Sequence, residues 1–285
     1  MAFVIQSSRK DLGGFSVARI IPNIKQRFIG PFVFVDHMGP AEFPAGKGIN
    51  VRPHPHIGLA TISYLMEGSM LHRDSLGSIQ EINPGDVNWM TAGKGIVHSE
   101  RETIETRGKD HVLDGLQCWI ALPEEKTEME PSFIHINRAQ LPYIHKEKLL
   151  MRLIAGEAYN YTSPVKTYSP MFYLDAITET GALVDRPCHE SETAVYVVSG
   201  SVKIGEDTFS AGQFIILEDE QTIETIENSR YFLLGGKKLE KAPILRWNFV
   251  AYDEAKIQEA EQRWANGQFP KIPGDDSEFI PQPGK

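Results

Sequence analysis

The chain has 285 residues, of which 41% are hydrophobic and 24% are charged, a globular composition with enough length for two domains. Its 38 acidic residues outnumber its 29 basic residues, the net charge is -9, and no basic cluster is longer than Lys237-Lys238. This balance argues against direct binding to nucleic acid, whose phosphates attract clustered cations. No apolar run approaches the roughly 18 residues of a membrane-spanning helix. Two widely separated cysteines, Cys118 and Cys188, and a start without a secretion signal favour the cytoplasm.

Short apolar segments separated by turn residues run through most of the chain. In chain order they include residues 32–35, 60–65, 116–120 and 171–174. Such segments, separated by Gly and Pro, are typical of β-sandwiches and barrels. We therefore predict an all-β fold.

One strand-and-turn pattern occurs twice. Residues 64–70 (YLMEGSM) match residues 196–202 (YVVSGSV), and each copy is followed by a second turn before an apolar strand. The repeat indicates two related β-domains. An acidic, Pro-containing connection over residues 123–143 sets the boundary near residue 137, so the expected domains are 1–137 and 138–285.

The C-terminal region is expected to differ from the rest. Ile257, Ala260 and Trp264 recur at helical spacing, which predicts a helix over residues 252–264. The residues after Gly267 include four prolines and are expected to lie extended across the surface.

Two pairs of metal-ligating residues lie about forty residues apart. His54 and His56 form an HxH pair on a predicted strand, and His98 and Glu100 form a second pair. Residues two apart on a strand project to the same face, so each pair can present two ligands together. The flexible segment 91–95 can bring the pairs into one site. Three imidazoles and one carboxylate leave open positions on a divalent ion, which indicates a reactive metal and not a structural one.

The same segments resemble a known family. Residues 54–58 (HPHIG), 64–69 (YLMEGS) and 84–100 (PGDVNWMTAGKGIVHSE) look like the signature of the pirin family, which are bicupins of the cupin superfamily. The resemblance extends from residues 30–36 to residues 247–249. It implies two tandem jelly-roll cupin domains, the first with one metal, usually iron, held at His54, His56, His98 and Glu100.

The sequence does not determine which metal ion is bound. The ligand set accepts Fe(II), and also Mn, Co, Ni, Cu or Zn. Many cupins carry a Glu four or five residues after the second His, but Ala60 and Thr61 occupy those positions here. The resemblance places the carboxylate at Glu100 instead.

The second copy of the repeat lacks a matching set. Cys188, His189, Glu190 and Glu192 precede a strand, but no histidine follows His189. We expect the second domain to hold no metal. His72 and Asp74 lie two residues apart on a predicted strand and either support the site by hydrogen bonding or belong to a solvated hairpin.

The resemblance implies two kinds of function. Some members of the family cleave the flavonol quercetin with O2, and Glu100 would then be the catalytic base that takes the 3-hydroxyl proton. Others are described as redox-sensitive, iron-dependent regulators that bind a protein partner. A Lewis-acid isomerase or hydrolase is a third alternative, because cupins host unrelated reactions.

Overall fold

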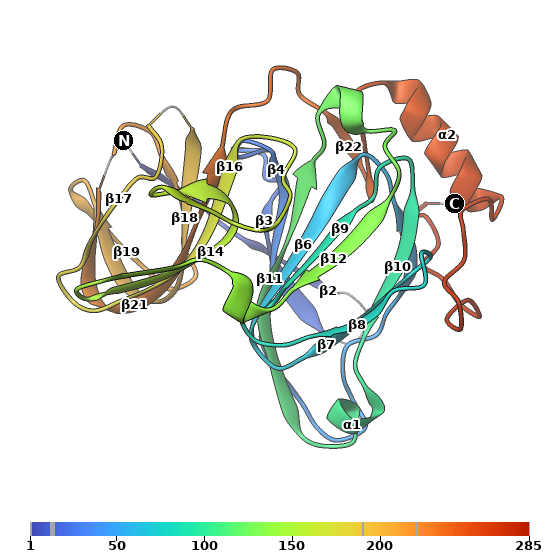
Figure 1. The fold of residues 1–285 in the computed structure, drawn as a ribbon, viewed down its shortest axis with the longest axis horizontal. Coiled ribbons are helices and arrows are strands. Elements are labelled where there is room, and N and C mark those ends of the chain that lie inside the picture. Colours follow the sequence, from blue (N-terminus) through green and yellow to red (C-terminus); the bar gives the residue numbers. More distant parts are fainter. Residues whose placement is uncertain (1, 12–14, 190, 221, 285) are drawn as a thin grey trace. The chain divides into compact units, whose positions relative to one another are not determined.

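The computed structural model describes residues 2–11, 15–189, 191–220 and 222–284. Strands account for 53% of the chain and helices for 8%, which confirms the predicted all-β class. The chain divides into two compact units, each built from separate segments (Figure 1). Unit 1 comprises Met1–Ser8, Ile20–Phe32 and Ala139–Leu239, and unit 2 comprises Arg9–Arg19, Val33–Arg138 and Glu240–Lys285.

Unit 1 contains a sheet that has ten strands among the described residues. Its continuous path is β1 (Phe3–Ile5), β20 (Phe214–Leu217), β18 (Glu192–Ile204), β21 (Thr222–Gly236), β16 (Met171–Thr178), β14 (Leu149–Ala158) and β13 (Tyr143–Lys146). The other three strands are β15 (Tyr161–Thr162), β17 (Leu183–Asp185) and β19 (Asp207–Ser210). Alternating side chains of β14 and β21 point into an aliphatic core that includes Leu153, Val195 and Leu233.

Unit 2 contains most of two further sheets. One has the order β5 (Val51–His56), β10 (Ile96–Arg101), β7 (Met70–Asp74) and β8 (Ile79–Ile82). The other has the order β12 (Ser132–Ile136), β9 (Val87–Thr91), β6 (Leu59–Glu67), β11 (His111–Ala121), β4 (Phe32–Phe43), β3 (Ser16–Ile21) and β2 (Ser8–Asp11). Strand β12 lies inside the segment expected to be a connection, where it pairs with β9.

The helices are short, and one of them covers part of unit 2. The described α-helices are α1 (Ile104–Arg107) and α2 (Glu254–Ala265), and the described 3₁₀-helices are η1 (Glu124–Lys126) and η2 (Arg138–Gln140). A two-stranded ribbon of β22 (Ile244–Arg246) and β23 (Phe249–Ala251) precedes α2. Asp253 caps α2 by accepting a 2.9 Å hydrogen bond from the Ala255 amide. Ile257 and Ala260 are buried in one cluster with Val97 and Ile57. The predicted C-terminal helix is therefore present, displaced by one or two residues.

The two predicted domain ranges and the two compact units differ at the chain ends. Residues 240–285 belong to the compact unit that contains residues 33–138, because α2 and the segment after it pack against Ile57, which follows β5, and Val97 of β10. Residues 20–32 belong to the unit that contains residues 139–239. The limits 1–137 and 138–285 thus stay a prediction of how the two repeats divide the sequence.

The internal repeat is visible in the backbone. Gly68 and Gly200, the central residues of the two matching turns, have φ of +79° and +77°. A Cβ on Gly68 would lie 2.1 Å from the Val112 oxygen, and one on Gly200 would lie 2.4 Å from the Asn228 oxygen. Both turns require glycine because the partner strand passes so close.

Candidate metal centre

Two neighbouring strands carry the predicted ligands. β5 holds His54 and His56, and β10 holds His98 and Glu100. The strands are antiparallel, and His98 lies opposite His54. All four residues are buried, with at most 7% exposure. The alternation of side chains along a strand puts His54 and His56 on the same face of β5, and His98 and Glu100 on the same face of β10.

The three histidines form a compact group. Their candidate ligand nitrogens lie within 4.8 Å of one another, and Nε2 of His56 lies 3.1 Å from Nε2 of His98. Two nitrogens that share an ion at bonds of about 2.0–2.1 Å are separated by about 2.9–3.4 Å, depending on geometry. The distance between these two rings therefore fits a shared metal ion.

Backbone carbonyls fix the orientation of two rings. His54 Nδ1 donates to the Arg52 oxygen at 2.9 Å, and His56 Nδ1 donates to the Asn248 oxygen at 3.1 Å. Each Nε2 is then left without a proton and free to bind an ion, which is the usual arrangement of a metal-ligating histidine. Burial lowers the pKa of His54 to about 4 and the pKa of His56 and of His98 well below the usual value. Neutral imidazole is the form that binds metal.

Glu100 lies beside the three-histidine group and lines the same cavity as His54. Its Oε1 accepts a hydrogen bond from Gln117 Nε2. Burial raises the pKa of Glu100 to about 7, and the Gln117 hydrogen bond acts in the opposite direction. The group of ligand atoms within 4.8 Å contains the histidines and not this carboxylate. Glu100 as fourth ligand and as catalytic base stays a prediction.

A cavity of about 290 Å³ opens beside His54 and Glu100. One wall is a stacked pair, Phe34 and Trp119, with ring centroids 3.9 Å apart and planes 9° from parallel. Arg19 lies over the Phe34 ring at 4.5 Å and pairs with Asp36 through two hydrogen bonds of 2.9 and 2.8 Å. The remaining lining is largely apolar: Phe15, Met38, Ile49, Val51, Met70, Trp247 and Ile280, with Gln117 and Asn248. A largely apolar lining with a few polar groups is typical of a small-molecule site.

His72 and Asp74 support this site from the next strand. They are 3% and 0% exposed, so the alternative of a solvated hairpin is wrong. His72 Nε2 and Asp74 Oδ2 lie 3.1 Å apart, and the His72 ring stacks on Phe133 at 4.2 Å. The ring centroids of His72 and His98 are 5.4 Å apart. The pair therefore packs directly behind a predicted ligand.

The remaining candidate ligands lie elsewhere. His37 pairs with Asp114, His111 with Glu102 and His135 with Asn88, all at 2.7–2.8 Å. In unit 1, Cys188 and His189 are exposed, and Glu190 lies outside the described residues. Within the described part of the chain, His54, His56 and His98 form the one group of this kind that could hold an ion.

Sequence reasoning missed two residues that hold the ligands. Gln117 lies on β11 opposite Ser63, in a strand with no motif of its own, and donates to Glu100. Asn248 contributes its backbone oxygen to His56 from 192 residues away. A backbone acceptor leaves no mark on residue type, so no sequence pattern could identify it.

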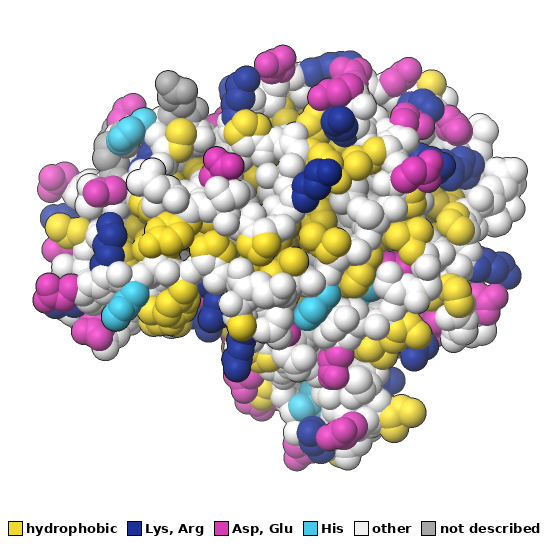
Figure 2. Space-filling model, in the orientation of Figure 1, with side chains coloured by type: hydrophobic (Ala, Val, Ile, Leu, Met, Phe, Trp, Pro, Cys, Tyr) yellow, Lys and Arg dark blue, Asp and Glu magenta, His cyan; other side chains and the backbone are white. Residues whose placement is uncertain are grey.

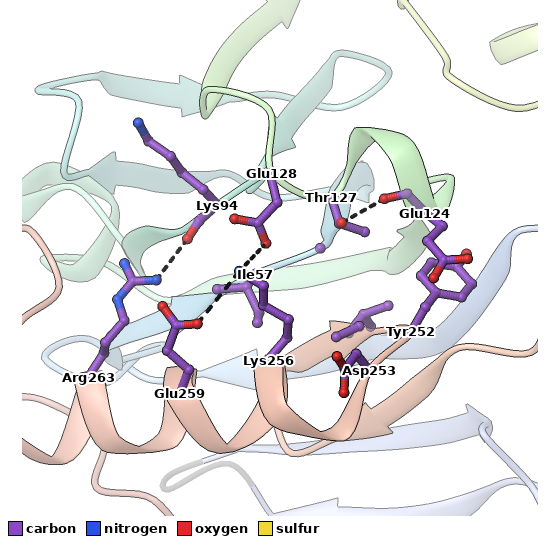
Figure 3. A pocket seen from close by; sticks show the side chains of 13 residues that line it. Ile57, Lys94, Glu124, Thr127, Glu128, Tyr252, Asp253, Lys256, Glu259 and Arg263 are labelled. Carbon is purple, nitrogen blue, oxygen red and sulfur yellow. Dashed lines mark hydrogen bonds and ion pairs between the residues drawn. The ribbon is translucent and has the colours of Figure 1, made fainter.

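A second cavity, of about 200 Å³, lies between α2 and the segments that contain Ile57, Lys94 and Thr127 (Figure 3). Lys256 lies 3.4 Å from Glu128 and 3.6 Å from Glu259, and Arg263 donates to the backbone oxygen of Lys94 at 3.1 Å. It contains none of the histidines. The candidate functional site is therefore the first cavity, which His54 and Glu100 line.

Comparison with known proteins gives the same family throughout the chain. The Pirin family matches residues 14–120, and the Pirin C-terminal cupin domain matches residues 173–270. A pirin-like protein of Caulobacter vibrioides is 44% identical over 98% of both chains. Human pirin is 32% identical over 90% of this chain and 89% of its own. The crystal structure of quercetin 2,3-dioxygenase from Acinetobacter baumannii superimposes with a TM-score of 0.90 at 35% identity, covering 100% of this chain and 95% of that one. The protein is a bicupin that belongs to the pirin family.

Proposed function

We propose that this protein is a metal-dependent dioxygenase that cleaves a flavonol such as quercetin with O2 at His54, His56, His98 and Glu100, with one Fe(II) per chain. The observation that carries the proposal is the cavity in which His54 and Glu100 meet the stacked wall of Phe34 and Trp119. The similarity to a quercetin 2,3-dioxygenase over nearly the whole chain supports the same substrate class.

Different residues of the chain would bind the substrate and take up its proton. The Phe34–Trp119 wall and the apolar side chains beside it would give the flat ring system a contact surface, because small-molecule pockets are lined mainly by apolar and aromatic side chains. Glu100, with its pKa raised to about 7 by burial, takes the 3-hydroxyl proton of the flavonol. A bound divalent ion would supply charge stabilisation for the resulting oxyanion and orientation toward O2.

The surroundings of Glu100 would keep one of its oxygens available and limit the access of water. Its second oxygen is left for the substrate or the ion, because the described hydrogen bond from Gln117 goes to Oε1. Apolar side chains such as Met38, Met70 and Ile280 form much of the remaining cavity wall. They exclude water, which strengthens the interaction between the charged groups and limits side reactions.

A two-step absorbance experiment tests the proposal. Iron-loaded protein is mixed with a flavonol without oxygen, and we expect a shift of the visible band as the deprotonated flavonol binds. Admission of O2 should then bleach the band with repeated turnover. A shift without bleaching would contradict the dioxygenase and favour the alternative, an iron-dependent, redox-sensing regulator that binds a protein partner.

On the face drawn in Figure 2, acidic and basic side chains are interspersed, so no strongly charged docking patch stands out there.

A further inference from the structure

The outer face of the ligand strand β10 carries a second set of contacts. Because side chains alternate, Ser99 and Arg101 point away from His98 and Glu100. Both contact Asp275, which lies in the segment after α2. Ser99 Oγ donates to Asp275 Oδ2 at 2.7 Å, and Arg101 donates to both carboxylate oxygens at 2.9 and 2.8 Å. One carboxylate from the C-terminal segment thus binds the two residues that flank Glu100.

Asp275 is well suited to hold this position. It is 9% exposed, and although burial acts to raise its pKa, hydrogen bonds from Arg101 and Ser99 lower it overall. Arg73, which lies opposite Ser99 on β7, adds a further positive charge nearby. A paired, partly desolvated carboxylate of this kind makes stronger hydrogen bonds than a neutral group.

Five residues further on, the same segment reaches the edge of β5 and the metal cavity. The Ile280 amide donates to the Pro53 oxygen at 2.8 Å, next to His54, and the Ile280 oxygen accepts from Trp264 Nε1 at 3.0 Å. β5 is an edge strand of its sheet, and the Ile280 side chain lines the cavity that contains His54 and Glu100. The segment therefore passes from the outer face of β10 round the edge of β5 to the inner cavity.

Apolar packing alone does not secure this segment. A cavity of about 300 Å³ lies beside it, lined in part by Pro53, Val97, Trp264 and Phe279. The Phe279 side chain is 58% exposed. The segment is attached to β10 by Asp275 and by Glu278, whose carboxylate accepts a 3.0 Å hydrogen bond from Arg101, and to β5 by the Ile280 amide.

We propose that Asp275 is a positioning residue of the metal centre, which latches residues 275–280 across β5 and β10 so that Ile280 forms the closing wall of the cavity. The inference rests on the proposed metal site but not on the reaction carried out there. Release of the latch would free the wall at Ile280 and loosen the strand that carries His98 and Glu100. Ions and substrate would then exchange faster, although no ligand has been removed.

The test compares Asp275→Asn with Asp276→Asn in the full-length protein. Both changes remove one negative charge, but Asp276 is exposed and pairs with the exposed Lys271 at 3.5 Å, whereas Asp275 is hydrogen-bonded to Ser99 and Arg101 of β10. Two quantities are measured: hydrogen exchange of the Ile280 amide in metal-free protein, and the rate at which a chelator removes Co(II) from loaded protein. Ser99→Ala, which keeps the Arg101 contacts, serves as a milder second variant in case Asp275→Asn does not fold.

We expect Asp275→Asn to speed exchange at Ile280 about 10- to 100-fold, the effect of losing a charged hydrogen bond, and to speed Co(II) release about 10- to 100-fold, as for other changes behind metal ligands. Ser99→Ala should shift both rates in the same direction by less, and Asp276→Asn should match the parent. Unchanged exchange at Ile280 in Asp275→Asn and Ser99→Ala would overturn the latch. Faster exchange with unchanged Co(II) release would overturn the positioning role. Absence of Co(II) from the parent would refute the proposed metal site, and exchange at Ile280 would still decide the latch.

Discussion

His56 donates from Nδ1 to the backbone oxygen of Asn248 at 3.1 Å, across 192 residues of sequence. This bond sets the tautomer of a histidine that lies in the first half of the chain. Residues 240–285 therefore contribute to the candidate metal centre, and their contacts connect the orientation of His56 to residues that have no metal-binding motif.

Replacement of the histidines should remove the metal. We expect His98→Ala to lose most of the ion and the double variant His54→Ala, His98→Ala to lose all of it, because too few ligands remain for tight binding. His145→Ala is the matched control, since His145 is exposed on β13. Elemental analysis of each purified protein gives the metal per chain. Full occupancy in the double variant would show that the ion is held elsewhere.

Glu100→Gln tests the base. The amide keeps an oxygen of similar size, so part of the metal should be retained, but it cannot accept the flavonol proton. Turnover should fall by roughly 10²–10⁴, the contribution of a positioned general base. Oxygen uptake is measured at equal metal content. A rate equal to that of the parent protein would refute the base role of Glu100.

Unit 1 should contribute no metal. Cys188 and His189 are exposed and lie far in sequence from any other histidine. The double variant Cys188→Ser, His189→Gln should therefore keep the metal content of the parent in elemental analysis. A loss of half the metal would instead reveal a second site.

Gly58 lies two residues after His56 and should be less replaceable than Gly77. Gly58 has φ of +67°, and a Cβ there would lie 1.9 Å from the Val250 oxygen. Gly77 has φ of +89°, with nothing within 4 Å of an added Cβ. Left-handed backbone costs a non-glycine residue about 1–2 kcal/mol, so Gly77→Ala should lower the free energy of unfolding by about that amount. Gly58→Ala should lower it further, because the backbone next to His56 must move.

Urea denaturation of the metal-free proteins compares the two glycine variants. The slope of the unfolding free energy against urea concentration should be the same for both variants. The urea concentrations at the midpoints of unfolding then report the difference in stability. Equal losses would show that the close approach of Val250 has no energetic consequence.

The sequence predicts the ligand strands well because strand periodicity is local. The spacing of His54 and His56, and of His98 and Glu100, is sufficient to place each pair on one face. The matching turns at Gly68 and Gly200 likewise show the repeat directly. These features depend on residues that are close together in the chain.

Long-range contacts could not be predicted in the same way. Residues 240–285 join residues 33–138 in unit 2 through apolar packing of α2 on residues more than 150 positions earlier in the chain. Many other apolar segments of the sequence have a similar composition, so the sequence does not identify the one on which α2 packs. The contacts from Asn248 to His56 and from Asp275 to Ser99 depend on backbone position and tertiary geometry. Asp275 itself lies in a polar, Pro-containing segment that resembles an ordinary surface tail.

The described helices differ from membrane-spanning helices in length and hydropathy. Among the described residues, no helix is both long and apolar enough to span a bilayer. Helix α2, the longer of the two α-helices described, extends over Glu254–Ala265 and carries charged residues along much of its length.

The proposed reaction is the cleavage of a flavonol by O2 in the cavity that His54 and Glu100 line. Its most direct test measures oxygen consumed and carbon monoxide released when iron-loaded protein is given quercetin, with metal-depleted His98→Ala protein as the control. We predict that each quercetin consumed takes up one O2, releases one CO and yields the ring-opened ester that carries both oxygen atoms of the O2. The control should show none of these three changes. Tight binding of quercetin to the loaded protein, with no oxygen uptake and no carbon monoxide, would contradict the account.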